Sequence, residues 1–215
     1  AKVVVHRAML RLGSFDTWFR FHPELGARLL IAPLSDPSQV RTVPLAPFWT
    51  WHIANAFQDG DGLTIDLSRY PDLGSLEEIG SGKVSAPPKL ERLTVSRSGA
   101  ARFQRFTEQP TEFPVVRAER VGLRHRYVWC QADGRDAPST ILRVDTETGA
   151  LEGYTPTEDE WLGEAVLAPV SDREDDAYVL THCLDRTRDR TCLAVLRADR
   201  LADGPLCKLW FDAPL

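Results

Sequence analysis

The chain has 215 residues, of which 43% are hydrophobic and 27% are charged, and its formal net charge is -5. This composition supports a globular core and excludes a largely disordered chain. The acidic balance disfavours a nucleic-acid-binding surface, which usually needs a basic face, so we expect no nucleic-acid partner.

Short strand-like runs, separated by turn residues, follow one another along the chain. They are rich in β-branched and aromatic residues and several alternate with period 2, which predicts strands. Asp59-Gly60-Asp61 supplies a hairpin turn before one of them. The predicted strands cover residues 3–5, 17–21, 27–32, 62–67, 90–95, 101–106, 126–130, 140–144, 150–154, 165–170, 177–183, 192–196 and 206–211.

No window shows a sustained apolar stripe at helical spacing, and short helical turns are expected only near residues 75–79 and 198–201. Evenly spaced short strands predict an all-β fold, which is a sandwich, a barrel or a propeller. No exact repeat is visible, which disfavours a WD-type propeller. Residues 68–88 are rich in Gly, Pro and Ser and predict a loop between strand clusters. We therefore expect residues 1–215 to form a single domain.

The four cysteines, Cys130, Cys183, Cys192 and Cys207, lack the CxxC spacing of a zinc site. Three of them lie in apolar strand-like runs, where Cys usually behaves as a small buried hydrophobe. Pairing of Cys183 with Cys192 across a hairpin stays open. This cysteine usage favours a reducing, cytoplasmic location.

The two ends of the chain lack the marks of a complete protein. The first residues already read as a strand, no signal peptide precedes them, and the one methionine is Met9. The last residues, 209–215, include no polar tail, and no apolar run approaches the roughly 18 residues that span a bilayer. We therefore expect a chain truncated at both ends.

Residues 48–59 place one imidazole, His52, among aromatic and apolar side chains, followed by Asn55 and an acidic turn. A histidine in such a setting is held rigidly and shielded from bulk water, as a metal ligand needs to be. The alternative is an ordinary core histidine, hydrogen-bonded and inert. The surrounding aromatic residues are candidates to line a substrate tunnel or, alternatively, to pack in the core; they are Phe48, Trp49, Trp51 and Phe57.

Four segments, in this order, resemble the carotenoid cleavage oxygenases, and together they cover nearly the whole chain. The second of them, with His52 and Asn55, is similar to the family's iron-ligand segment. The chain departs from the family pattern at Gln58, Ala165, Leu167 and Ala168, which bears on its subfamily and substrate. The four segments are residues 21–28, 52–55 with 66–70, 112–114 with 126–129, and 163–169 with 174–180.

This resemblance implies a seven-bladed β-propeller with Fe(2+) on its axis, held by four histidines that three glutamates orient. His52 is the one credible ligand in this chain, so the other three would lie outside it. The resemblance assigns Glu112 and Glu164 as orienting glutamates and indicates no catalytic residue beyond the metal site. The chain would then be a C-terminal portion of the propeller, about four to five blades of antiparallel strands.

Each of these carboxylates also has an ordinary structural interpretation. Glu112 could be a strand-end surface residue, but Pro114 favours an extended Phe113 and hence a defined direction for Glu112. Glu164 precedes an apolar run, and a carboxylate entering a buried strand needs a partner. The acidic residues 172–176 lack the ligand and Gly spacing of an EF-hand and predict a solvated hairpin loop.

The remaining histidines have no ligand context, and we expect surface or structural roles for them. They are His6, His22, His125 and His182.

The family resemblance implies an oxidoreductase that uses O2 to cleave a C=C bond of a carotenoid, an apocarotenoid or a stilbene-like (lignostilbene) substrate to two carbonyl products. Peripheral membrane contact by a full-length protein stays open. The isolated 215 residues are expected to be inactive, because one imidazole does not hold Fe(2+) tightly. The alternatives are a non-catalytic β-propeller or β-sandwich binding module and, with less support, a calcium-dependent hydrolase or lactonase propeller.

Overall fold

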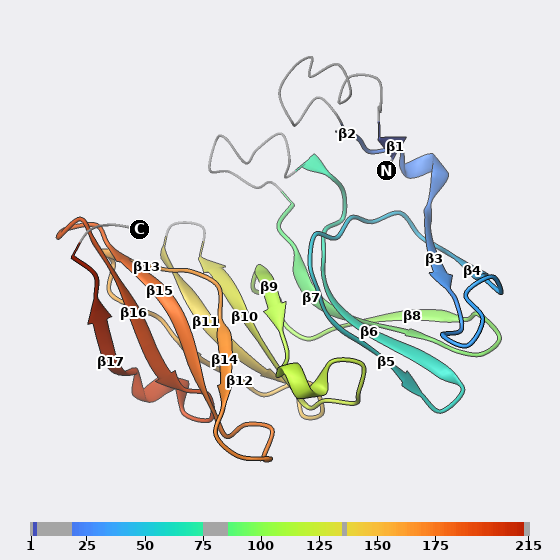
Figure 1. The fold of residues 1–215 in the computed structure, drawn as a ribbon. Coiled ribbons are helices and arrows are strands. Elements are labelled where there is room, and N and C mark those ends of the chain that lie inside the picture. Colours follow the sequence, from blue (N-terminus) through green and yellow to red (C-terminus); the bar gives the residue numbers. More distant parts are fainter. Residues whose placement is uncertain (1, 4–18, 75–85, 135–136, 213–215) are drawn as a thin grey trace. The chain divides into compact units, whose positions relative to one another are not determined.

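A computed structural model describes residues 2–3, 19–74, 86–134 and 137–212 (Figure 1). Besides turns and loops, the described chain contains β-strands and three-residue 3-10 helices, and the strand pairings with a defined register are antiparallel. The all-β prediction is therefore confirmed. The chain divides into two compact units, residues 1–50 with 69–88 and residues 51–68 with 89–215. The single-domain assignment stays a prediction.

The first unit contains two small sheets. In one, β1 (Lys2–Val3) pairs with β2 (Phe19–Arg20), and in the other β3 (Ala27–Ile31) pairs with β4 (Arg41–Leu45). The 3-10 helix η2 (Pro23–Leu25) precedes β3.

The second unit contains three larger sheets, which follow one another in chain order. The first sheet has the order β5-β6-β7-β8: β5 (Ile53–Asp59), β6 (Gly62–Arg69), β7 (Lys89–Val95) and β8 (Ala101–Arg105). The second has the order β12-β11-β10-β9: β9 (Thr111–Val115), β10 (Tyr127–Gly134), β11 (Ala137–Asp145) and β12 (Leu151–Tyr154), with η3 (Ala118–Arg120) between β9 and β10. The third contains β13 (Glu160–Leu162), β14 (Val166–Pro169), β15 (Ala177–Asp185), β16 (Arg190–Arg197) and β17 (Pro205–Trp210), with η4 (Leu201–Asp203) before β17.

The middle sheet is buried on both faces because side chains alternate along β10. Val128 and Cys130 join a cluster with Leu90 of β7, whereas Trp129 joins a second cluster with Val179 of β15. Each cluster contains residues from two sheets, so the hydrophobic contacts hold neighbouring sheets of this unit together.

Most predicted strands match observed ones, and the differences have physical reasons. Strands β4 and β9 contain Pro44 and Pro114, which interrupt a strand-like pattern but are tolerated at a sheet edge, where both strands lie. The predicted loop from residue 68 begins too early, because Ser68 and Arg69 still belong to β6. The helical turn expected at residues 198–201 forms slightly later, as η4. The turn expected at residues 75–79 lies outside the described residues.

Candidate metal-ligand site

His52 lies immediately before β5, and its imidazole pairs with Glu112 of β9. The Nδ1 atom of His52 is 3.1 Å from Oε2 of Glu112. The backbone carbonyl of His52 accepts a hydrogen bond from the N–H of Ser68 at 3.0 Å, which joins it to β6. The imidazole side chain is 45% exposed, so the expectation that His52 is shielded from bulk water is wrong for the described residues. The Glu112 side chain is 15% exposed. The structure thus brings together two of the three predicted site residues.

A β-bulge in β9 determines the direction of the Glu112 side chain. Gln131 of β10 faces Glu112 and Trp129 faces Val115, so two residues of β9 lie opposite one of β10. Phe113, within this bulge, has a φ of +52°, a left-handed conformation that is rare for a bulky residue. The prediction of an extended Phe113 is therefore wrong, since the bulge overrides the preference that Pro114 imposes.

The bulge also brings Phe113 into contact with both site residues. Its N–H donates to Oε2 of Glu112 at 2.8 Å, and its ring centroid is 4.8 Å from that of His52. Glu112 therefore has a fixed carboxylate, and one face of the imidazole has an aromatic neighbour.

The His52–Glu112 hydrogen bond assigns the tautomer of the imidazole. A carboxylate can accept but not donate, so the proton of the neutral ring lies on Nδ1. The lone pair then belongs to Nε2, the atom that a metal would bind. This is the arrangement expected for a histidine that binds a metal and is oriented by a second residue. Among the residues that the structure describes, no group of three or more His, Cys, Asp or Glu side chains could hold a metal ion, so His52 would contribute one ligand to a larger set.

Glu164 lies in the loop between β13 and β14 and is exposed. The strand that follows, β14, is only partly buried, so the premise that Glu164 enters a buried strand is wrong. Within the described ranges, no hydrogen bond or ion pair joins the Glu164 side chain to another residue. Its role as an orienting glutamate stays a prediction.

The four aromatic residues proposed for a tunnel have different surroundings. Phe57 is 4% exposed, and its ring packs edge-on against His125, with centroids 5.5 Å apart, so it is a core residue of its unit. Trp51 belongs to the same unit and is half-buried. Phe48 and Trp49 belong to the first unit, where Arg69 covers the Phe48 ring and Trp49 pairs through its backbone with Tyr70.

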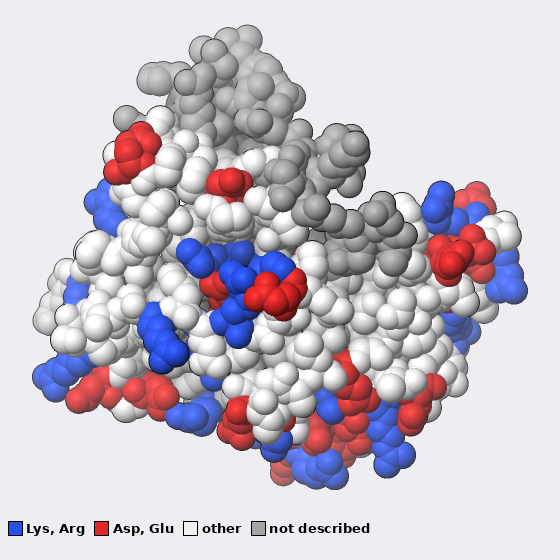
Figure 2. Space-filling view, turned by 180° about the vertical axis from the view of Figure 1, so that it is seen from behind, with Lys and Arg blue, Asp and Glu red and all other residues white. Residues whose placement is uncertain are grey.

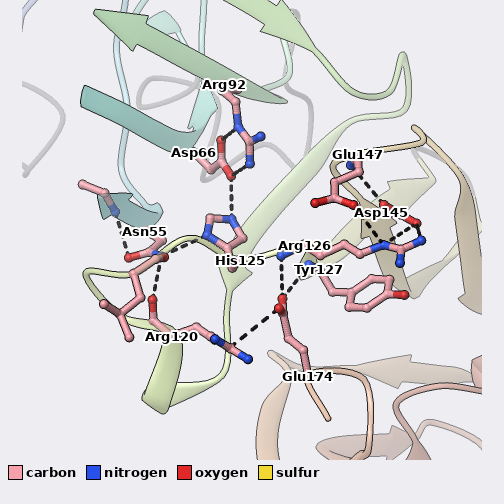
Figure 3. A network of polar contacts seen from close by, with 12 residues as sticks. Asn55, Asp66, Arg92, Arg120, His125, Arg126, Tyr127, Asp145, Glu147 and Glu174 are labelled. Carbon is pink, nitrogen blue, oxygen red and sulfur yellow. Dashed lines mark hydrogen bonds and ion pairs between the residues drawn. The ribbon is translucent and has the colours of Figure 1, made fainter. Parts of the chain in front are cut away.

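The side chain of Asn55, three residues after His52, has a structural role that sequence reasoning missed. Its Oδ1 accepts from the N–H groups of Ala56 and Gly122, each at 2.9 Å, and its Nδ2 lies 2.9 Å from the carbonyls of Arg120 and Leu123 (Figure 3). The signal was present, because Asn55 belongs to the segment that resembles the family pattern, but its partners are 65 to 68 positions away.

A buried charged group stands next to Asn55. Nε2 of His125 is 2.7 Å from Asp66, and Asp66 accepts two hydrogen bonds from Arg92, at 2.8 and 2.7 Å. Burial would raise the pKa of Asp66, but the hydrogen bonds from Arg92 and His125 outweigh it and leave the pKa below its ordinary value. The structural role expected for His125 is confirmed.

The acidic loop at residues 172–176 is more than a solvated hairpin loop. Oε1 of Glu174 accepts from the backbone N–H groups of Arg126 and Tyr127, at 2.7 and 2.8 Å, and its side chain is largely buried (Figure 3). Arg117 donates to the carbonyls of Ser171 and Arg173. The loop is therefore bound to the segment between β9 and β10.

The other described histidines and the cysteines differ in their exposure and contacts. His22 is paired with Glu24 and His182 is exposed on β15, whereas His6 lies outside the described residues. Cys130, Cys183 and Cys192 are buried free thiols and Cys207 is an exposed one. On the molecular face in Figure 2, basic and acidic side chains are interspersed. Within the ranges that the structure covers, no helix is long and apolar enough to cross a bilayer.

Comparison with protein families gives one match that covers almost the whole chain. The model described as RPE65, retinal pigment epithelial membrane protein, matches residues 2–215. Apocarotenoid-15,15'-oxygenase of Synechocystis is 28% identical over 204 residues, which are 88% of this chain and 41% of that protein. Carotenoid cleavage oxygenase of Mycobacterium tuberculosis is 25% identical over 199 residues, which are 85% of this chain and 40% of that protein. The chain thus spans about two fifths of these curated relatives.

Solved structures show the same fold. An ACO/RPE65 chimera has a TM-score of 0.87 at 23% identity, and the match covers 99% of this chain and 47% of that one. Cobalt-substituted Synechocystis ACO has a TM-score of 0.85 at 22% identity, again over 99% and 47% of the two chains. These likenesses show the fold of the matched portion.

Proposed function

The chain belongs to the carotenoid cleavage oxygenase (RPE65) family, and on that premise we propose that it is part of a non-haem Fe(2+) dioxygenase. The substrate class is a hydrophobic polyene or stilbenoid: a carotenoid, an apocarotenoid or a stilbene-like molecule. One C=C bond of it is cleaved with O2 to give two carbonyl products. In this proposal the described sheets are blades of a larger β-propeller.

The pairing of His52 with Glu112 is the observation that supports this proposal most directly. A neutral imidazole with its proton on Nδ1 presents the Nε2 lone pair, which is the donor that Fe(2+) accepts from histidine. The residues present therefore fit the metal as one ligand with its hydrogen-bond partner. His52 would bind the ion, and a bound Fe(2+) would supply the chemistry of O2 at the double bond.

The residues around His52 have a positioning task in this proposal. Glu112 accepts a hydrogen bond from Nδ1–H of His52, which fixes the tautomer and the rotation of the imidazole ring. Phe113 limits water on one face of the ring. Glu164 would do the same as Glu112 for a histidine outside the described residues.

The proposed substrate class rests on the relatives and on the histidine nitrogen that would bind the metal. The relatives named above are oxygenases of apocarotenoids and carotenoids, and such substrates carry no charge that the protein must pair. Phe48, Trp49 and Trp51 are the remaining candidates for apolar contact with a substrate, because Phe57 is used in the core. We expect the 215 residues by themselves to show no turnover, since they offer one imidazole.

Metal analysis of purified protein tests this proposal, with His52→Ala as the variant. His182→Ala is the matched control, because His182 is an exposed histidine in the same unit. In the longest available form of the protein, we expect stoichiometric iron in the wild type and the control, and loss of iron in His52→Ala. Cleavage of an apocarotenoid to aldehydes, followed by chromatography, should be lost in parallel. Equal iron content in His52→Ala and wild type would contradict the ligand assignment, and a protein that never takes up iron would support the binding-module alternative.

A further inference from the structure

The Asn55 side chain joins the strand that carries His52 to the segment that follows the strand of Glu112. Asn55 lies at the third position after His52, and Glu112 lies five residues before Arg117, where the segment 117–127 begins. Asn55 contacts this segment at Arg120, Gly122 and Leu123 and at the His125 ring, with all four distances between 2.9 and 3.0 Å. One side chain thus links the two halves of the His52–Glu112 pair.

Both strands of the pair need such a link, because both are irregular where the site residues lie. Strand β5 has a register shift between Ile53 and Asn55, directly after His52, and β9 has the bulge at Phe113. A bulge removes regular ladder hydrogen bonds and changes the direction of nearby side chains. Asn55 is the first residue after the shift in β5, where it pairs with Asp66 of β6.

The hydrogen bonds of Asn55 have one consistent orientation. Its Oδ1 accepts two backbone N–H groups, so its Nδ2 must face the carbonyls and Nδ1 of His125. An amide N–H next to Nδ1 requires that nitrogen to be unprotonated, which puts the His125 proton on Nε2, facing Asp66. Asp66 is in turn held by Arg92 (Figure 3). Asn55, His125 and Asp66 are all buried. Their hydrogen bonds to one another are therefore not readily exchanged for hydrogen bonds to water.

The segment 117–127 is also held from its other side. Glu174 accepts from two of its backbone N–H groups and lies 3.7 Å from Arg120, and Arg117 binds the carbonyls of residues 171 and 173. Because the segment is anchored to the third sheet in this way, it is a firm support for Asn55. Loss of the Asn55 hydrogen bonds would therefore shift β5 relative to β9, because the segment 117–127 would stay in place.

We propose that Asn55 is a positioning residue for the metal ligand, which sets the orientation of His52 toward Glu112 through the buried group Asn55–His125–Asp66–Arg92. This inference rests on the proposed function in so far as it treats His52 as a ligand. It assigns to Asn55 a role beyond the stability of the unit, since its partners lie in the segment that follows β9, the strand of Glu112.

The position of the proton on His52 tests this role without any metal. Protein labelled with 15N-histidine contains five labelled rings, and His52→Gln identifies the signals of His52. In the wild type we expect the proton on Nδ1. In Asn55→Ala we expect both tautomers of His52, because the Glu112 carboxylate no longer lies at hydrogen-bond distance. Asp185→Asn is the matched control, since Asp185 is a buried carboxylate at the turn between β15 and β16, where it binds Arg188.

A second variant covers the case in which Asn55→Ala does not fold. Asn55→Asp keeps the shape and the acceptor oxygen but loses both donor hydrogens, and we expect the same change in His52, to a smaller extent. Titration with Co(2+), in the longest available form of the protein, is the second measurement. A lost supporting contact around a metal ligand typically weakens metal affinity by roughly 10- to 100-fold, which we expect for both Asn55 variants and not for Asp185→Asn.

The outcomes separate the two proposals. An unchanged His52 tautomer and unchanged Co(2+) affinity in a folded Asn55 variant would overturn the positioning role. If the longest available form of the wild-type protein has the expected tautomer but binds neither Co(2+) nor Fe(2+), the proposed function is instead overturned.

Discussion

The Nδ1 atom of His52 lies 3.1 Å from Oε2 of Glu112, although the two residues are 60 positions apart in the chain. The contact joins the start of β5 to the bulge of β9, two strands from different sheets. Because Nδ1 faces this carboxylate, Nε2 is the ring nitrogen that a metal would bind.

Glu112→Gln is expected to weaken metal binding by roughly 10- to 100-fold with little loss of stability, because the amide keeps an acceptor but removes the charge that favours the Nδ1 proton. The measurement is a Co(2+) competition titration of the longest available form of the purified protein. Glu119→Gln, on the exposed η3, is the control and should bind as the wild type does. Equal affinity in both variants would mean that Glu112 does not orient His52.

Asp66→Asn is expected to lower the free energy of unfolding by about 3 kcal/mol or more, because the Arg92 guanidinium then loses its buried, charged partner. The native pKa of Asp66 lies below its ordinary value of 3.8, so its contribution is present above that value and is lost as the pH falls through the native pKa. Chemical denaturation at several pH values should therefore give a smaller acid-dependent loss in Asp66→Asn than in wild type. Asp172→Asn, in an exposed loop, should retain the wild-type pH profile.

The cysteines are expected to react with iodoacetamide in two classes. Burial raises the pKa of the Cys183 and Cys130 thiols to about 12, and burial also raises that of Cys192, so these groups are neutral and shielded in the native state. Peptide mass spectrometry should find the label on exposed Cys207 first, and on the other three only after unfolding. Rapid native labelling of Cys183 would show that the third sheet opens locally.

Trp129→Ala is expected to lower the free energy of unfolding by about 3–5 kcal/mol, because Trp129 is fully buried in the cluster that joins the second and third sheets. Trp161→Ala is the control, since its ring is 53% exposed and contacts the Arg186 guanidinium, and it should cost about 1 kcal/mol or less. Urea denaturation followed by far-UV circular dichroism compares the two. Similar losses would mean that the two sheets do not depend on this cluster.

Local patterns were enough to predict where most strands lie and that the chain is all-β. Strand-forming residues and the turn at residues 59–61 act over a few positions, so their effect is readable from the sequence. The strands with Pro44 and Pro114 were harder, because a proline is tolerated at a sheet edge and only the tertiary structure places an edge.

The candidate site likewise has features that the sequence predicts and features that only the tertiary structure shows. His52 and Glu112 could be proposed from local segments and their resemblance to a family, and their contact was an expectation of that resemblance. The left-handed conformation of Phe113 could not be predicted from the sequence. The local preference before Pro114 is extended, and only the pairing of β9 with β10 imposes the bulge. The roles of Asn55, Asp66 and Glu174 were also hidden, because each of these side chains has a partner between 26 and 70 positions away.

The amino-acid sequence by itself determined the all-β class and the buried character of three cysteines, and it indicated the segment whose histidine we propose as a metal ligand, because these depend on side-chain chemistry and short-range spacing. Tertiary structure alone decided the left-handed bulge at Phe113, which nitrogen of the His52 ring faces the carboxylate, and which polar side chains are buried together. A hydrogen bond between distant residues exists only when sheet packing brings donor and acceptor within about 3 Å, and no local pattern specifies that distance.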